Sequence, residues 1–250
     1  MARARKLRPA ADPEGLVQAL PLDGAQAADL RESGLLELAL THRSYAFEHE
    51  ATPHNERLEF LGDSVLGLAT TEHLYTTYPT VPEGVLAKRR AAIVSMRALA
   101  ILARRLHLGD YVRLGRGEDL SGGREKPSIL ADTLEAVFGA VHLACGPDVS
   151  RRVVLEVLAP LLDSDEMLEA GFDFKTRLQE IAAEVGTVPV YTVTGSGPEH
   201  SPVFTAVATV QGVVTAEGTG PSKKEAELAA AQQAVRAVLT ERGESLFPRA

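Results

Sequence analysis

Apolar residues recur at helical spacing through the first two thirds of the chain. Four stretches carry this pattern, with Gly and Pro between them: 35–40, 58–75, 86–106 and 129–143. Because residues three and four apart share one face of a helix, each stretch predicts a helix with a buried face. One more helix is predicted over 149–162, before an acidic stretch. We therefore expect a mainly α domain over 13–162 and a linker over 163–171.

The periodicity changes after residue 172. A short helix is predicted over 175–183, and a final helix runs from 222 to about 241. Between them, β-forming residues alternate or cluster between Gly-rich turns in three stretches, 188–193, 203–210 and 213–217. Helix, three strands and helix predict a small α+β (α-β-β-β-α) domain over 172–242.

The composition is that of an ordinary globular protein, with 250 residues of which 45% are hydrophobic. This length accommodates two domains. No apolar run approaches the roughly 18 residues that span a bilayer, so no membrane partner is expected. The basic start lacks the apolar stretch of a signal peptide. Cys145 is the single cysteine and cannot form an internal disulfide, which favours a cytoplasmic location.

Two pairs of carboxylates lie at helical spacing in two separate predicted helices. We call these four residues the acidic quartet: Glu59, Asp63, Asp132 and Glu135. Ionised carboxylates brought together repel one another, so such a site must bind protons or a cation. Oxygen ligands alone favour Mg²⁺, with Mn²⁺ as a substitute. Such an ion lowers the pKa of a bound water and neutralises charge on a phosphodiester. The alternative is that the acids occupy solvated helix faces.

The segment NERLEFLGDSVL, residues 55–66, closely resembles the signature of ribonuclease III, the endonuclease that cuts double-stranded RNA. Further matches follow in the family's order: THRSY at 41–45, LGRGE at 114–118, SGG at 121–123 and ILADTLEA at 129–136. The resemblance implies that the acidic quartet ligates the metal, with Asp63 and Glu135 the least replaceable catalytic residues.

Other signature residues carry expectations from the same resemblance. Glu56 matches a further acidic position that would organise substrate or water. Ser64 would orient a carboxylate, or bond to its own helix backbone instead. Phe60 would lie at the contact of a homodimer in which each subunit supplies one site, unless it packs in the core.

The second module resembles the double-stranded-RNA-binding domain in LQE at 178–180, GPEH at 197–200 and SKKEAE at 222–227. The family match implies that Gln179 and His200 reach the minor grooves, while Lys223 and Lys224 hold the phosphates between them. Ser222 and Glu225 have the spacing of a capping box, in which Glu225 bonds to the Ser222 backbone. Two lysines at the positive end of a helix oppose its stability, which indicates an anionic ligand.

The resemblance implies Mg²⁺-dependent hydrolysis of double-stranded RNA in rRNA and mRNA processing and decay. The expected products carry 5′-phosphate and 3′-hydroxyl ends with short 3′ overhangs. The net charge of −8 is unusual for an RNA-binding protein, so local cations must guide the substrate. The best patch is residues 88–90 with Arg97. Two other functions remain open: a protein that binds RNA without cutting it, and a Mg²⁺-dependent hydrolase of small phosphate esters.

Overall fold

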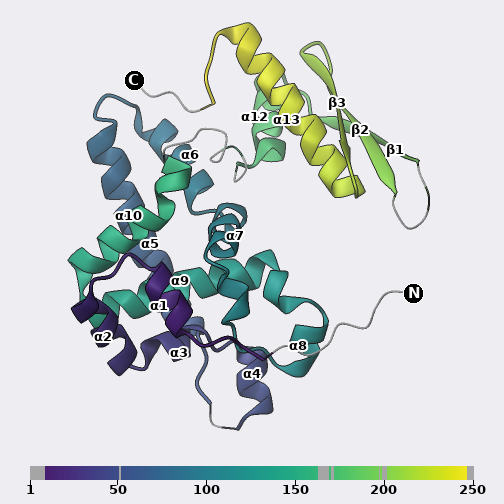
Figure 1. The fold of residues 1–250 in the computed structure, drawn as a ribbon. Coiled ribbons are helices and arrows are strands. Elements are labelled where there is room, and N and C mark those ends of the chain that lie inside the picture. Colours follow the sequence, from purple (N-terminus) through teal and green to yellow (C-terminus); the bar gives the residue numbers. More distant parts are fainter. Residues whose placement is uncertain are drawn as a thin grey trace. The chain divides into compact units, whose positions relative to one another are not determined.

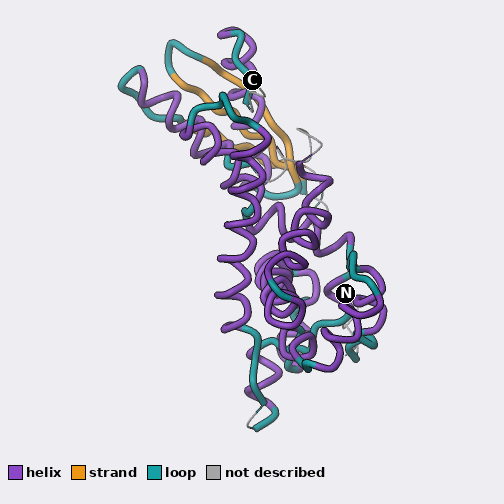
Figure 2. The backbone as a smooth tube through the Cα atoms, turned by 90° about the vertical axis from the view of Figure 1, so that its left-hand side faces the viewer, coloured by secondary structure: helices purple, strands orange, loops and turns teal. Residues whose placement is uncertain are grey.

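The structure, a computed structural model, describes residues 9–50, 52–162, 169, 172–196, 198 and 202–246. The chain forms two compact units, Met1–Gly171 and Phe172–Ala250 (Figure 1). All strands of the described residues belong to the second unit, where they appear orange in Figure 2. The expected order, a helical domain followed by an α+β domain, is confirmed.

Unit 1 consists of helices joined by short turns. Its α-helices are α1 (Glu14–Ala19), α2 (Gly24–Glu32), α3 (Leu35–Ala39), α4 (Arg43–Glu48), α5 (Glu56–Thr77), α6 (Glu83–Ile93), α7 (Met96–Arg105), α8 (Arg116–Leu120), α9 (Pro127–Cys145) and α10 (Pro147–Leu162). Two 3₁₀ helices, η1 (Leu108–Asp110) and η2 (Gly123–Glu125), lie between α7 and α9. The long helices follow the predicted stretches, whereas α1, α2, α4 and α8 were not predicted individually.

Helix α9 is the centre of unit 1. It packs against α2, α3, α5, α7 and α10, and most of its side chains are buried. By length and composition it would also pass as a membrane span, contrary to the expectation that no apolar run is long enough. Since 61% of its most apolar window is buried inside unit 1, it is a core helix.

Helix α5 begins at a fixed point and crosses α9 closely. Before its first residue, the buried Asn55 donates through its side chain to the Ala39 carbonyl (3.1 Å) and through its backbone to the Thr41 carbonyl (2.9 Å). A Cβ at Gly62 would lie 1.7 Å from the Glu135 carbonyl oxygen, and one at Gly139 would lie 2.4 Å from the Leu58 carbonyl oxygen. The two backbones therefore meet at glycines.

The single helix predicted over 86–106 is wrong, because the structure has two helices with a break at residues 94–95. Ser95 is extended and caps α7 by accepting a bond from the Ala98 amide (3.2 Å). A Ser side chain competes well for free amides at a helix start, which explains why α7 begins anew here.

The segment between α7 and α9 is fixed by a buried ion pair. The Arg124 side chain donates to Asp119 (2.7 Å) and to the carbonyls of Gly109 (2.9 Å) and Val112 (2.8 Å). Satisfying buried carbonyls in this way holds η1, α8 and η2 together. A stretch predicted only as turns is therefore ordered at the entrance to α9.

Unit 2 is a three-stranded antiparallel sheet covered on one side by helices. Strands β1 (Val190–Ser196), β2 (Val203–Val210) and β3 (Val214–Gly220) lie in the order β1-β2-β3. Helices α12 (Phe174–Glu184) and α13 (Lys223–Arg242) pack on each other, and α13 packs on the sheet. A Cβ at Gly218 in β3 would lie 2.1 Å from the Ala230 amide nitrogen. Only glycine at this position therefore allows α13 to pack so closely on β3.

Two expectations for unit 2 need correction. Strands β1 and β3 start later and extend further than predicted. In β3, the glycines Gly218 and Gly220 lie at a close contact with α13 and continue the strand instead of ending it. Ser222 does cap α13 by accepting from the Glu225 amide (3.2 Å). The Glu225 carboxylate, however, accepts from the Ser222 hydroxyl (2.8 Å) rather than from the backbone, so the reciprocal bond of the capping box was wrong.

Candidate metal centre

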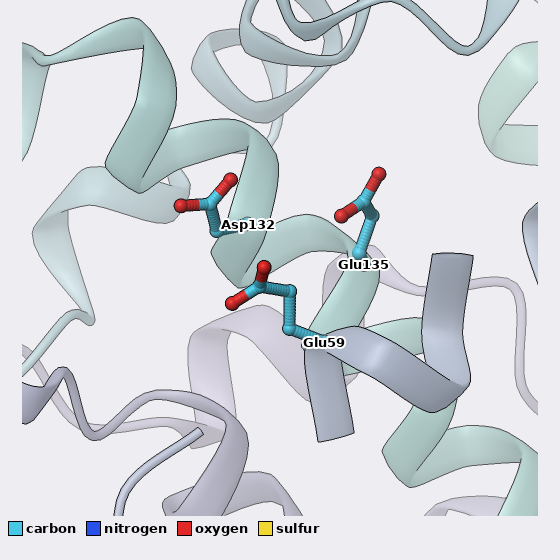
Figure 3. Close-up of side chains that lie close together, drawn as sticks. All are labelled: Glu59, Asp132 and Glu135. Atoms are coloured by element: carbon cyan, nitrogen blue, oxygen red, sulfur yellow. The ribbon is translucent and has the colours of Figure 1, made fainter. Parts of the chain in front are cut away.

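Three carboxylates of the acidic quartet converge where α5 crosses α9. Each of Glu59, Asp132 and Glu135 offers an oxygen, and these oxygens lie within 4.8 Å of one another. In Figure 3, Glu59 extends from α5 toward the two acids that project from neighbouring turns of α9. Segments more than seventy positions apart in sequence thus form one acidic cluster.

The glycine contacts explain this convergence. Gly62 and Glu135 face each other at the crossing, and Glu59 lies one helical turn before Gly62. Side chains three positions apart share a face, so Glu59 and Gly62 both face α9. The close approach of the backbones brings short acidic side chains from two helices within reach of a single ion.

Asp63, the fourth member of the quartet, lies outside the 4.8 Å cluster. Its side chain is exposed on α5. Its charge is nevertheless the largest electrostatic influence on Glu135. Asp63 therefore lies close enough to Glu135 to act on its charge, and the structure brings three of the four expected ligands into direct proximity.

Burial and mutual repulsion raise the pKa of the clustered acids. The pKa of Glu135 rises to about 8, first because the group is desolvated and then because Asp63, Asp132 and Glu59 surround it. Desolvation also raises the pKa of Glu59 and of Asp132, and the Asp132 charge adds to the effect on Glu59. Because the carboxylates of this cluster repel one another, a divalent cation would stabilise their charged forms. Their oxygen donors fit a hard ion such as Mg²⁺.

The cluster opens into a cavity of about 990 Å³ in unit 1. Its walls come from α4, α5, α8 and the start of α9, and they include acidic, basic and histidine side chains. Residues that line it besides Glu59 and Asp132 include His42, Arg43, Glu48, Glu56, Glu118 and Lys126. The metal centre is therefore accessible to a ligand of considerable size.

Backbone amides at the start of α8 donate hydrogen bonds to side chains of α4. The Gly115 amide donates to the Ser44 hydroxyl (2.9 Å), and the Arg116 amide donates to the Glu48 carboxylate (2.8 Å). A Cβ at Gly115 would lie 2.4 Å from the Ser44 carbonyl oxygen. These contacts position α8 so that Glu118 lines the cavity.

Lys126 and Arg43 are cavity residues to which the sequence assigned no role. Lys126 forms an ion pair with Glu118, and this contact lowers the pKa of that carboxyl. Both residues belong to motif regions, THRSY and the entrance to ILADTLEA, so the motifs themselves were the signal. Their place in the cavity could not be predicted, because the sequence does not show that these two distant motifs line the same cavity.

The remaining signature residues take separate positions. Glu56 lines the cavity and contacts Arg43 (3.3 Å). The Ser64 hydroxyl donates to the Phe60 carbonyl (3.4 Å), which is the backbone bond left open as an alternative. Phe60 is 79% exposed, so core packing within this chain is excluded for it.

The basic patch predicted over residues 88–90 is wrong in its central member. Arg89 is buried, with its guanidinium 4.6 Å from the ring centroid of Tyr78, and Arg90 donates to the Thr71 hydroxyl (3.2 Å). A planar guanidinium stacks well on an aromatic face, so a run of cations in sequence can turn inward.

In unit 2, three of the predicted RNA contacts can be located. Gln179 is exposed on α12, and Lys223 and Lys224 are exposed in the first turn of α13 without an acidic partner among the described residues. Other cations of this unit are paired, Lys175 with Glu227 and Arg242 with Glu184. His200 lies outside the described residues.

Two family models match the chain, one for each unit. The model described as ribonuclease-III-like matches residues 32–162, and the double-stranded RNA binding motif matches residues 174–238. The first match contains the acidic cluster and its cavity. The second contains all three strands and most of both helices of unit 2.

Curated relatives align over most of the chain. Ribonuclease 3 of Streptomyces coelicolor is 57% identical over 208 residues, which cover 83% of this chain and 75% of that protein. Ribonuclease 3 of Leifsonia xyli is 56% identical over 209 residues, covering 83% and 88%. Among solved structures, the nuclease domain of ribonuclease III from Campylobacter jejuni is 38% identical, with a TM-score of 0.55, and covers 61% of this chain and all of that one.

Proposed function

Because this chain belongs to the ribonuclease III family and is an endoribonuclease that cuts double-stranded RNA, we propose that the acidic quartet holds the divalent cation on which cleavage depends. The observation that carries this proposal is the convergence of Glu59, Asp132 and Glu135 within 4.8 Å. We assign the ion as Mg²⁺, with Mn²⁺ as a substitute, because the donors are carboxylate oxygens.

The residues have distinct tasks in the proposed reaction. When bound, the cation supplies Lewis-acid activation of water and neutralises charge on the phosphodiester. Glu59 and Asp132 hold the cation from two helices. Asp63 and Glu135 are the catalytic members, since Glu135 is the most strongly perturbed acid and Asp63 is its main electrostatic neighbour. Glu56 lines the cavity as a group that organises substrate.

The products follow from the proposed geometry of two sites. We propose a homodimer in which each subunit supplies one site and the two sites cut opposite strands. This arrangement would yield 5′-phosphate and 3′-hydroxyl ends with short 3′ overhangs. The exposed Phe60 supports a subunit contact, and the related Campylobacter nuclease domain has a flexible region that is involved in dimer formation.

We assign the two units as domains, a catalytic domain over 13–162 and a double-stranded-RNA-binding domain over 172–242, with 163–171 as the linker. The family-model boundaries support this division. Processing and decay of rRNA and mRNA in the cytoplasm is the proposed role, since that is where a bacterial family member meets structured transcripts.

In the second domain, Gln179 and His200 are proposed to contact the minor grooves, and Lys223 and Lys224 the phosphates between them. Both lysines are exposed at a helix start, where free amides already favour anions. Changing both to Gln should weaken binding equally for duplexes of different sequence and reduce the salt slope by roughly two. Titrations of several duplexes over a range of salt test this, and an unchanged slope would contradict it.

Cleavage of a long RNA duplex by the wild type and by Glu135→Gln tests the metal centre. Wild type should cut only with Mg²⁺, whereas the variant should bind the duplex with similar affinity and cut at least ~100-fold more slowly, as expected when a group that acts in the transition state is lost. Glu125→Gln is the matched control, because Glu125 is an exposed acid in η2 outside the cavity. Full activity of Glu135→Gln would refute the assignment.

A further inference from the structure

The backbone of Arg43 is held in place by its neighbours, whereas its side chain is exposed. The His42 amide donates to the Arg113 carbonyl (3.1 Å), and the Ser44 hydroxyl accepts from the Gly115 amide (2.9 Å). The Arg43 side chain between these anchors is 71% exposed. Its backbone is thus fixed at the start of α4, and Arg43 lines the cavity.

Among the described residues, one weak contact restrains the guanidinium. Arg43 Nη1 lies 3.3 Å from Glu56 Oε1, and the Glu56 side chain is itself half-exposed. Exposed ion pairs of this kind contribute little free energy, so the guanidinium can exchange this partner for a stronger one. Its charge also acts on the acidic cluster, since it partly offsets the rise in the pKa of Glu59 and of Asp132 that burial causes.

The other Lys or Arg among the described residues that line this cavity is already engaged. Lys126 contacts the Glu118 carboxylate and lies 3.1 Å from the Ser121 hydroxyl. A substrate phosphate entering the cavity would have to break this pair, which is less exposed than that of Arg43. Arg43 is therefore the cation that a phosphate can recruit most easily.

We propose that Arg43 binds a phosphate of the RNA strand that enters the cavity, and that Glu56 holds the guanidinium until RNA replaces it. This inference rests on the proposed function of the cavity. The planar guanidinium matches two phosphate oxygens at once, and such charge-assisted pairs are strong. In a protein of net charge −8, a cation beside the carboxylates also offsets their repulsion of the RNA backbone.

The number of phosphates neutralised can be measured from the salt dependence of binding. In a Glu135→Gln background, which we expect to bind without cutting, the full chain carrying Arg43→Gln, Arg43→Lys or Arg31→Gln is titrated with an RNA duplex over a range of KCl at constant Mg²⁺. Arg31 is the matched control, because it is exposed, pairs with Glu14 (2.7 Å) and does not line the cavity.

Arg43→Gln should reduce the slope of log affinity against log salt by about one, since one phosphate contact is lost. At low salt its affinity should fall by about tenfold, as for loss of a hydrogen bond to a charged group. Arg43→Lys should keep the slope and lose part of the affinity. Arg31→Gln should match the background in both respects.

An Arg43→Gln slope equal to that of Arg31→Gln would overturn the inference, and so would a loss of slope in Arg43→Lys. Because the side chain is exposed, thermal unfolding should be unchanged in all three variants, which separates lost contacts from lost folding. Cleavage by the chain with Glu135 intact is followed in parallel. Absent cleavage contradicts the proposed function, whereas normal cleavage with an unchanged slope contradicts only the assignment of Arg43.

Discussion

At the scale of single residues, the most perturbed group is Glu135. Its carboxyl is desolvated and surrounded by like charges, so in the folded protein it holds its proton up to a pH of about 8, compared with an ordinary value of 4.5. At physiological pH, burial of Glu135 therefore lowers the free energy of unfolding of the metal-free protein. A bound cation would offset this loss, which couples metal binding to folding.

The stability of the metal-free protein should accordingly depend on pH with a definite sign. The folded state binds the Glu135 proton more tightly than the unfolded chain does. This contribution is therefore complete below pH 4.5 and is lost as the pH rises toward about 8. Urea unfolding in EDTA should show a falling free energy of unfolding across this window, and Mg²⁺ should restore it.

Glu135→Gln should flatten this decline, because the neutral amide has no proton to lose. Glu118→Gln is the matched control within the cavity. The pKa of Glu118 is lowered by Lys126, so its contribution is present at high pH and is lost only under acidic conditions. If wild type in EDTA grew more stable between pH 4.5 and 8, the account of the cluster would be wrong.

At the scale of elements, the crossing of α5 and α9 packs the core of unit 1 and also brings the clustered acids together. Gly62→Ala places a methyl group against the Glu135 backbone and should separate the helices. We expect a loss of at least about 1–3 kcal/mol, as in overpacked cores, together with loss of cleavage. Urea unfolding and a cleavage assay measure both effects.

Gly67→Ala provides the control on the same helix. No atom lies within 4 Å of a Cβ at this position, so the substitution should stabilise the protein by up to about 1 kcal/mol through helix propensity alone. Equal stability of Gly62→Ala and Gly67→Ala would show that the close crossing does not constrain the helices.

The elements also show what sequence can and cannot predict. Long helices such as α5 and α9 were predictable because their apolar positions repeat over several turns, and the signature acids could be placed on them. The break at Ser95 was missed, since helical spacing of apolar residues continues on both sides of it. Asp63 was expected in the cluster, but helical periodicity fixes only its face and not the direction of its side chain. The inward turn of Arg89 depends on a tertiary contact with Tyr78 that no local pattern contains.

At the scale of the whole molecule, α5 presents an apolar stripe to solvent. Phe60, Leu68 and Tyr75 are exposed, and their spacing of eight and seven residues keeps them on one side of the helix. An exposed aromatic stripe beside the proposed site is typical of an interface between subunits. It supports a dimer that brings two metal centres into one assembly.

Phe60→Asp should convert the proposed dimer to a monomer, because an acid replaces an aromatic anchor. Loss of such an anchor weakens association by about 2 kcal/mol or more. Sedimentation analysis over a range of concentrations measures this. Met96→Asp, at an exposed apolar position in the first turn of α7, should remain dimeric. A dimeric Phe60→Asp protein would remove Phe60 from the interface.

Helix α9 contributes two acids to the acidic cluster, yet most of its other side chains lie in the core of unit 1. Amides in such a segment exchange with solvent deuterium only when the whole domain unfolds. The carboxylates of Asp132 and Glu135 thus belong to a helix whose backbone should resist local unfolding. Their spacing should therefore survive the thermal fluctuations that open less buried parts of the unit, so the two carboxylates should keep their positions when RNA enters the cavity.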